Sequence, residues 1–229
     1  MTITHATLIR SAAVAAVAAG LIFIGIQIGH PHSDVTSVTT TEWAVRNSFK
    51  VVMAALALVG ITGMYLRQVK QIGLLGLLGY LLFGAGYLTI IGVAFVSAYV
   101  LPSIAETDPG YANDVLAAAT NGTATGDIGL MQAALTVSGI TFLGGGLIFG
   151  IALYRARVLA RWAAALLAVA SLLTVTLAVL PDAFYRFLAF PNSIAMIGLG
   201  YSLWVTTRTE TTTLPTGIDT PPLTAASAR

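Results

Sequence analysis

The amino-acid sequence predicts an all-α integral membrane protein, a bundle of six transmembrane helices with both termini in the cytoplasm. The chain is 57% hydrophobic and only 9% charged, whereas a soluble domain carries about 25% charged residues. Six apolar stretches have the ~20 residues that are needed to cross ~30 Å of hydrocarbon. Basic residues lie mainly between alternate stretches, which predicts an orientation.

The predicted spans cover residues 9–29, 43–66, 72–99, 128–154, 161–180 and 184–206. The first is not read as a signal peptide, because its apolar run from Ser11 to Ile28 is longer than the usual ~7–15 residues and no A-x-A-like cleavage site follows. The spans make one transmembrane domain, residues 1–206. The tail 207–229 is rich in Thr and Pro, and we expect it to be disordered in the cytoplasm.

Orientation follows from the basic residues between the spans. With the N-terminus inside, the cytoplasmic segments contain most of the 11 basic residues, namely Arg10, Arg67, Lys70, Arg155, Arg157, Arg161, Arg208 and Arg229. The outer segments contain Arg46, Lys50 and Arg186. The outer loop 100–127 carries acidic residues and no basic one, which agrees with the positive-inside rule. Its stretch "YANDVLAAA" predicts a short helix that ends at "TNG", over the mouth of the bundle or on the membrane surface.

Two histidines follow the first span in "GHPHSD". His30, His32 and Asp34 resemble part of the metallo-β-lactamase motif, but Val35 stands where that motif continues. The third histidine, His5, lies across the membrane in the predicted topology. A zinc ion needs three or four protein or water ligands, and the two histidines would need acidic residues from elsewhere. We predict that this stretch ends the span and holds no metal.

The predicted spans lack the groups that intramembrane chemistry uses. No Asp or Glu lies in the middle of an apolar run, although proton- and cation-coupled transporters usually contain one. There is no Arg ladder, no pair of histidines for haem, no acidic cluster for Mg²⁺ and no Ser–His pair for proteolysis. Cysteine is absent, which removes thiol catalysis. We therefore predict no catalytic residue, no cofactor and no nucleic-acid partner, and we favour a non-catalytic protein over an enzyme.

Polar residues near the outer face are the candidate ligand-binding residues. They are Arg46, Asn47, Lys50, Arg186 and Asn192. At a rise of 1.5 Å per residue, Arg46 and Lys50 lie roughly 5 and 10 Å inside the second span, where they could line a pocket for an anionic head group. In the structural alternative, each Arg pairs with the acid four residues before it, Glu42 or Asp182, and Lys50 extends to the interface. The sequence favours this alternative.

Glycines crowd the spans. A spacing of four residues, as at Gly25/Gly29 and Gly146/Gly150, lets helix backbones approach closely. We predict tight packing within the bundle, with a homodimer through these faces as the alternative. The run of three glycines at 144–146 could also permit a bend.

Residues 144–173, "GGGLIFGIALYRARVLARWAAALLAVASLL", resemble a stretch found in many uncharacterised actinobacterial multi-pass membrane proteins. Ala160 stands where those relatives often carry Pro. The resemblance implies a multi-pass protein of the bacterial cytoplasmic membrane and carries no particular activity with it.

Two classes of function fit these observations. The favoured class is a non-catalytic protein of the lipid bilayer that scaffolds or modulates a membrane-protein partner, or senses the envelope. The alternative is a small-molecule permease or lipid-binding protein with an outward-facing polar pocket. Geometry separates them, because a pocket requires Arg46 or Lys50 to face Arg186 across an open cavity.

Overall fold

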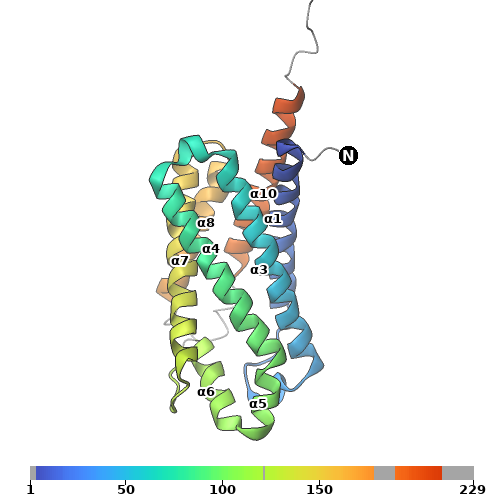
Figure 1. Ribbon diagram of the computed structural model, residues 1–229, viewed down its shortest axis with the longest axis vertical. Helices are drawn as coiled ribbons and strands as arrows, with labels where there is room; N and C mark the ends of the chain where they lie inside the picture. Colours follow the sequence, from blue (N-terminus) through green and yellow to red (C-terminus); the bar gives the residue numbers. More distant parts are fainter. Residues whose placement is uncertain (1–3, 121, 178–188, 213–229) are drawn as a thin grey trace, which may run out of the picture.

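The structure, a computed structural model, describes residues 4–120, 122–177 and 189–212. Every regular element in these ranges is an α-helix, as predicted (Figure 1). Four helices are long and apolar enough to cross a membrane: α1 (His5–Gln27), α3 (Thr41–Arg67), α4 (Val69–Tyr99) and α7 (Leu130–Ala156). Two more long helices follow, α8 (Arg161–Leu177) and α10 (Ala189–Thr212). The short helices are α2 (Val35–Val38), α5 (Leu101–Thr107) and α6 (Pro109–Ala119).

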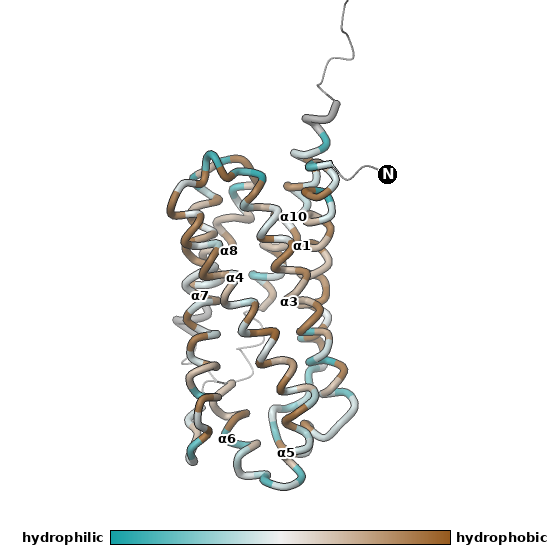
Figure 2. Tube along the Cα trace, in the orientation of Figure 1, coloured by the Kyte–Doolittle hydropathy of each residue, from teal (hydrophilic) through white to brown (hydrophobic). Residues whose placement is uncertain are grey.

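The long helices pack in chain order into a closed ring. Each of α1, α3, α4, α7, α8 and α10 contacts the next, and α10 packs extensively against α1. The start of α1 and the end of α10 therefore lie together at one end of the bundle (Figure 1), here called the terminal end. Figure 2 shows hydrophobic residues along the length of the long helices and hydrophilic residues around the turns at both ends.

Glycine residues allow close packing at three of the helix–helix contacts. Along α1–α3, a Cβ on Gly60 would lie 2.8 Å from Ala16 Cβ. Along α4–α7, a Cβ on Gly79 would lie 2.5 Å from a backbone nitrogen of α7. Along α7–α8, Gly146 meets Ser171, and a Cβ on Gly150 would lie 2.7 Å from a backbone nitrogen of α8. The predicted close packing at Gly146 and Gly150 is confirmed.

The prediction for Gly25 and Gly29 is wrong. Gly25 and Gly29 do not form a close-packed face, because α1 ends at Gln27 and Gly29 lies in the following turn with φ +64°. The run 144–146 lies inside α7, which continues from Leu130 to Ala156. The interruption falls in α4 instead, where Gly73 has φ 61° and ψ −166°, a conformation that favours glycine.

The ends of several elements also differ from the predictions. The loop 100–127 is largely helical, and the short helix predicted there begins earlier than expected. The Asp108 carboxylate accepts the N–H of Tyr111 at 2.9 Å, and Pro109 occupies the first turn, which together favour a helix start at this point. Helix α10 continues through Thr212, so residues 207–212 are helical. Residues 178–188 and 213–229, which include the predicted end of the fifth span, the start of the sixth and most of the tail, lie outside the described residues.

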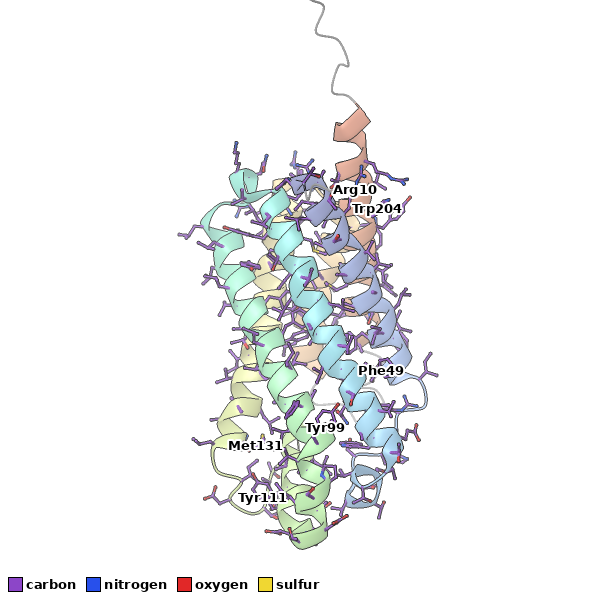
Figure 3. The ribbon with its side chains drawn as sticks, turned by 45° about the vertical axis from the view of Figure 1, so that its right-hand side comes forward. Arg10, Phe49, Tyr99, Tyr111, Met131 and Trp204 are labelled. Atoms are coloured by element: carbon purple, nitrogen blue, oxygen red, sulfur yellow. The ribbon has the colours of Figure 1, made fainter. Side chains whose placement is uncertain are left out.

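Helices α2, α5 and α6 form a cap at the end of the bundle opposite the terminal end (Figure 1). The cap has its own apolar core, separate from that of the long helices, which includes Val38, Trp43, Leu101, Ala112 and Leu116. Figure 3 places Tyr111 and Met131 at this cap end, and Arg10 and Trp204 at the terminal end. The predicted placement of a short helix over the bundle mouth is therefore confirmed.

Candidate functional site

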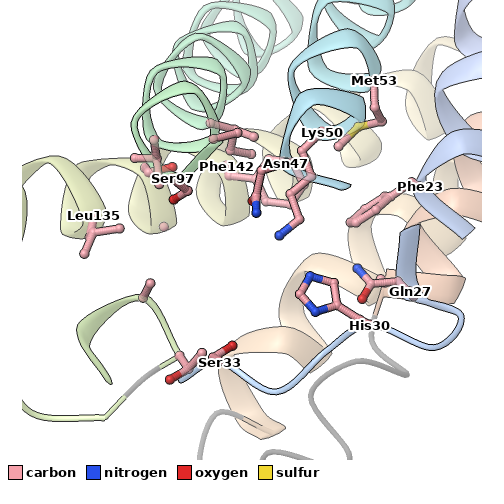
Figure 4. Close-up of a pocket in the computed structure, with 18 of the residues that line it drawn as sticks. Phe23, Gln27, His30, Ser33, Asn47, Lys50, Met53, Ser97, Leu135 and Phe142 are labelled. Carbon is pink, nitrogen blue, oxygen red and sulfur yellow. The ribbon is translucent and has the colours of Figure 1, made fainter. Parts of the chain in front are cut away.

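A cavity of about 420 Å³ lies between the ring helices and the cap. Its wall combines residues from α1, α3, α4, α6, α7 and α10 (Figure 4). Polar side chains of the wall include Gln27, His30, Asn47, Lys50, Ser97 and Asn192. Apolar side chains include Phe23, Met53, Tyr87, Ile90, Phe142 and Leu143. The cavity thus gathers residues that are distant in the sequence.

The cavity extends from the cap toward the middle of the bundle. The indole nitrogen of Trp43 donates to the Ser97 carbonyl at 2.9 Å, which sets α3 beside α4 near the cap. From Ser97, α4 runs toward the middle of the bundle, and Tyr87 lies about 15 Å deeper at 1.5 Å per residue. Met53 is likewise about 15 Å deeper than Trp43. The wall thus extends from the cap, where polar Ser97 and apolar Leu116 both line it, to Met53 and Tyr87 in the middle of the bundle.

Helix α3 supplies the polar residues Asn47 and Lys50 one turn apart. Asn47 is 2% exposed, and its amide nitrogen donates to the Trp43 carbonyl at 2.9 Å. This bond fixes the side chain against its own helix and leaves the amide oxygen as the group that can accept from another partner. Figure 4 shows the Lys50 amine extending toward Gln27 and His30. A cationic group thus lies in a partly apolar cavity.

Asn192 enters the cavity from α10. It is 6% exposed, and its amide oxygen has no hydrogen-bond partner among the described residues. A buried acceptor without a partner costs about 1–3 kcal/mol. The described residues therefore leave one polar atom of Asn192 without a hydrogen bond.

Arg46 makes the contact that the structural alternative predicts. Its guanidinium bonds the Glu42 carboxylate at 2.8 and 2.9 Å, so the predicted pair along the helix is confirmed. It also donates to the carbonyls of Ile26 and Ile28 at 2.9 Å each. These carbonyls lie at the end of α1, where backbone acceptors lack helical partners. Arg46 therefore joins α3 to the end of α1 and is not among the residues of the cavity wall.

Arg186 and its predicted partner Asp182 lie outside the described residues. Of the five candidate residues, the structure brings Asn47, Lys50 and Asn192 together and separates Arg46 from them. Sequence reasoning missed the contributions of Gln27 and Ser97. No signal in the sequence marks them, because single polar residues near helix ends are common and their direction depends on the packing of the ring.

The histidine stretch contributes to the cavity wall through His30. The ring of His30 donates from Nδ1 to the Pro31 carbonyl at 2.8 Å and meets the Trp43 ring edge-on, with centroids 5.9 Å apart. Asp34 accepts the Thr36 hydroxyl and the Ser37 N–H at 2.7 Å each, and these bonds, the Thr36 hydroxyl first, hold the pKa of Asp34 below its usual value. Among the described residues there is no group of three potential metal ligands, and the absence of a metal site stays a prediction.

The cap covers the cavity through α6. Leu116 and Ala118 line it, and the loop that follows is held to α6 by Asp114. The carboxylate accepts from the N–H and hydroxyl of Thr125 at 2.8 and 2.9 Å and from the N–H of Gly126 at 3.0 Å. These bonds, the Thr125 N–H first, lower the pKa of Asp114. The lid of the cavity is thus an ordered element.

The fold defines a class, namely an all-helical protein with helices able to cross a membrane. Comparison with protein-family models, curated proteins and solved structures gave no match to this chain. The cavity is therefore the feature from which a function can be inferred.

Proposed function

We propose that this chain is a six-span protein of the bacterial cytoplasmic membrane, with both termini inside, that binds a small molecule in the cavity beneath the cap. The proposal is the lipid-binding or permease class, which the sequence ranks second. The scaffold class, which the sequence ranks first, explains the role of Arg46 equally well but gives no reason for a polar cavity.

One observation carries the proposed binding function. Asn47 and Lys50 on α3 and Asn192 on α10 reach the same cavity from opposite ends of the chain. Ligand cavities of about 300–1,000 Å³ with an apolar lining and a few convergent polar groups are typical binding sites.

The proposed topology is supported by the distribution of charge. Arg67, Lys70, Arg155 and Arg161 all lie at the turns of the terminal end, whereas the acidic residues of α6 and its loop lie at the opposite end. The positive-inside rule then places the terminal end in the cytoplasm and the cap outside. Because the six ring helices alternate in direction, the end of α10 lies on the same side of the membrane as the start of α1.

Reporter fusions test the topology. Alkaline phosphatase joined after Asn121 should be active, because this enzyme works only outside the cytoplasm, and the same enzyme joined after Lys70 should be inactive. The reverse pattern would contradict the orientation, and two inactive fusions would contradict an outer cap.

Thiol labelling tests the cavity. The chain contains no cysteine, so a single introduced cysteine carries the one thiol that can react with a labelling reagent. Ser138→Cys places a thiol on the cavity wall and should react with a small water-soluble thiosulfonate that is added outside the cell. Ser193→Cys is the matched control on α10, since Ser193 is fully buried and should stay unreactive. If Ser138→Cys is as inert as the control, no accessible cavity exists and the scaffold class stands.

A further inference from the structure

We infer that the cavity binds an uncharged, largely apolar molecule whose carbonyl oxygen accepts a hydrogen bond from the Tyr87 hydroxyl. The inference rests on the proposed binding function and specifies its ligand. Three observations lead to it: the Tyr87 hydroxyl makes no hydrogen bond within the described part of the chain, its ring is held among apolar side chains, and the basic residues of the wall already interact elsewhere.

Tyr87 differs from the other two tyrosines of α4 in its hydrogen bonding. The Tyr80 hydroxyl pairs with the hydroxyl of Thr62 on α3 at 3.1 Å. The Tyr99 hydroxyl pairs with the hydroxyl of Ser48 on α3 at 2.7 Å. Between Ser48 and Thr62 the sequence of α3 contains no further hydroxyl group. The hydroxyl of Tyr87, which lies between the other two tyrosines, therefore has no such partner on α3.

The Tyr87 hydroxyl can be reached from the cavity, although the ring that carries it is fixed. The ring packs against Phe83 and Phe142, with centroids 4.7 and 5.3 Å apart, so it cannot turn its hydroxyl toward another part of the protein. Among the described residues, the Tyr87 oxygen is not one of the fully buried polar atoms that lack a partner. Because it has no partner, it keeps some accessible surface. Tyr87 lines the cavity, so that surface faces a ligand.

The Tyr87 hydroxyl favours a carbonyl group on the ligand. A phenolic hydroxyl has one hydrogen to donate, and a buried donor without an acceptor is unfavourable. The wall residues beside it, Ile90 one turn further along α4 and Phe142 on α7, have no acceptor in their side chains. A ligand hydroxyl would bring a second hydrogen, and one of the two hydrogens would stay without an acceptor. A carbonyl oxygen accepts the Tyr87 hydrogen and brings none of its own.

The charges of the wall favour an uncharged ligand. Lys50 and His30, the basic side chains of the described wall, already interact with other parts of the protein. Other polar side chains that line the cavity, Gln27, Ser97 and Ser138, are uncharged. Burying a charge that has no partner costs far more than burying a neutral polar group. A neutral carbonyl compound therefore suits this wall better than an ion does.

Photolabelling with benzophenone provides the test. Benzophenone is an uncharged ketone with two aromatic rings, and under ultraviolet light it inserts into C–H bonds that lie beside it. The full-length protein, in nanodiscs of zwitterionic lipid, is labelled over a range of benzophenone concentrations, and mass spectrometry locates the adducts. Labelling should be saturable and should fall on residues of the cavity wall such as Met53.

Three analogues then compete with benzophenone, each compared at its measured mole fraction in the lipid. Diphenylmethane lacks the carbonyl group, diphenylmethanol has a hydroxyl group in its place, and 4-benzoylbenzoate adds a negative charge. Benzophenone should bind with an affinity about tenfold higher than that of each analogue, which corresponds to about 1.4 kcal/mol.

Two tyrosine variants test the role of the hydroxyl. Tyr87→Phe removes the hydroxyl and keeps the ring, so it should lower the affinity for benzophenone about tenfold and leave the affinity for diphenylmethane unchanged. Tyr80→Phe is the matched control on the same helix, since the Tyr80 hydroxyl bonds Thr62 and does not line the cavity. It should change neither affinity. Circular dichroism of each variant shows whether it is folded.

The outcomes distinguish the inference from the proposed function. An unchanged affinity for benzophenone in Tyr87→Phe would overturn the hydrogen bond. Equal affinity for benzophenone and diphenylmethanol would overturn the carbonyl group, and equal affinity for benzophenone and 4-benzoylbenzoate would overturn the absence of charge. If no adduct forms on the cavity wall while Ser138→Cys remains reactive, the ligand class is wrong but an accessible cavity stands. If Ser138→Cys is also inert, the proposed function fails together with the inference.

Discussion

Arg46 joins two helices through one guanidinium group. It holds Glu42 on its own helix and two carbonyl oxygens at the end of α1, a combination that needs the planar fork of arginine. The Glu42 carboxylate is 55% exposed, and such a surface pair contributes little stability. The bonds to the carbonyls of α1 are therefore the larger contribution.

Arg46→Ala should lower the free energy of unfolding by about 2 kcal/mol, the scale of hydrogen bonds to a charged group. Arg46→Lys should recover only part of this, because one ammonium group cannot reach all three acceptors in the same geometry. Thermal unfolding in detergent provides the measurement. Arg155→Ala, at an exposed position of α7, is the control and should have little effect. An Arg46→Ala variant as stable as the control would remove Arg46 from the joint between α1 and α3.

Arg157 adopts a backbone conformation that is unusual for its residue type. It ends α7 with φ 58° and ψ 21°, the left-handed region that glycine adopts without strain. Arg157→Gly should therefore raise stability by about 1 kcal/mol. Arg155→Gly, two residues earlier and inside the last helical turn, should lower it by about 1 kcal/mol. Thermal unfolding of the two variants should shift in opposite directions, and a shift in the same direction would show that the turn has another conformation.

At the scale of elements, the close packing of α7 against α8 depends on glycines, which have no side chain, at the contact between the two helices. A Cβ on Gly150 would lie 2.7 Å from a backbone nitrogen and 2.9 Å from a backbone oxygen of α8, and backbone atoms cannot move aside without separating the helices. Gly144, on the same helix, has no described neighbour within 4 Å of such a position.

Even Gly150→Ala should therefore destabilise the protein, and Gly150→Leu and Gly146→Leu should disturb folding more strongly. Gly144→Ala is the matched control and should be neutral or stabilising by up to about 1 kcal/mol, since alanine favours helix more than glycine does. Thermal stability in detergent checks the pair. Equal effects of Gly144→Ala and Gly150→Ala would mean that α7 and α8 do not pack as closely as described.

The loop after α6 should respond to pH through Asp114. Because its pKa is lower in the folded protein than the ordinary value of 3.8, the contribution of its hydrogen bonds is complete above that value and is lost as pH falls through the lowered pKa. A spin label on Thr123→Cys should therefore be immobile at neutral pH and become mobile only below the ordinary value. In Asp114→Ala the label should be mobile at every pH. Glu106→Gln, at an exposed residue of α5, should preserve the transition.

At the scale of the whole molecule, the sequence predicts which segments are helical but not how they are arranged. Apolar length locates α1, α3, α4 and α7 to within a few residues, because a chain must satisfy its backbone internally wherever it crosses hydrocarbon. The ring could not be predicted, since an apolar helix has no strongly polar face to show which side packs inward. The cavity depends on the ring. The sequence identifies Asn47 and Asn192 as polar residues near helix ends. It does not show that they lie near one another, because that depends on the contact between α1 and α10.

That contact also constrains how the protein is made. Helix α1 leaves the ribosome first, yet one of its two neighbours in the ring is α10, the last of the described helices to be synthesised. If the ring is inserted into a membrane as proposed, the face of α1 that includes Gly20 and that later meets α10 is exposed to lipid or to the insertion machinery until α10 has been inserted. Premature termination before α10 would leave this face uncovered. A cell that degrades membrane proteins with unpaired helices could therefore recognise an unfinished chain by its first helix.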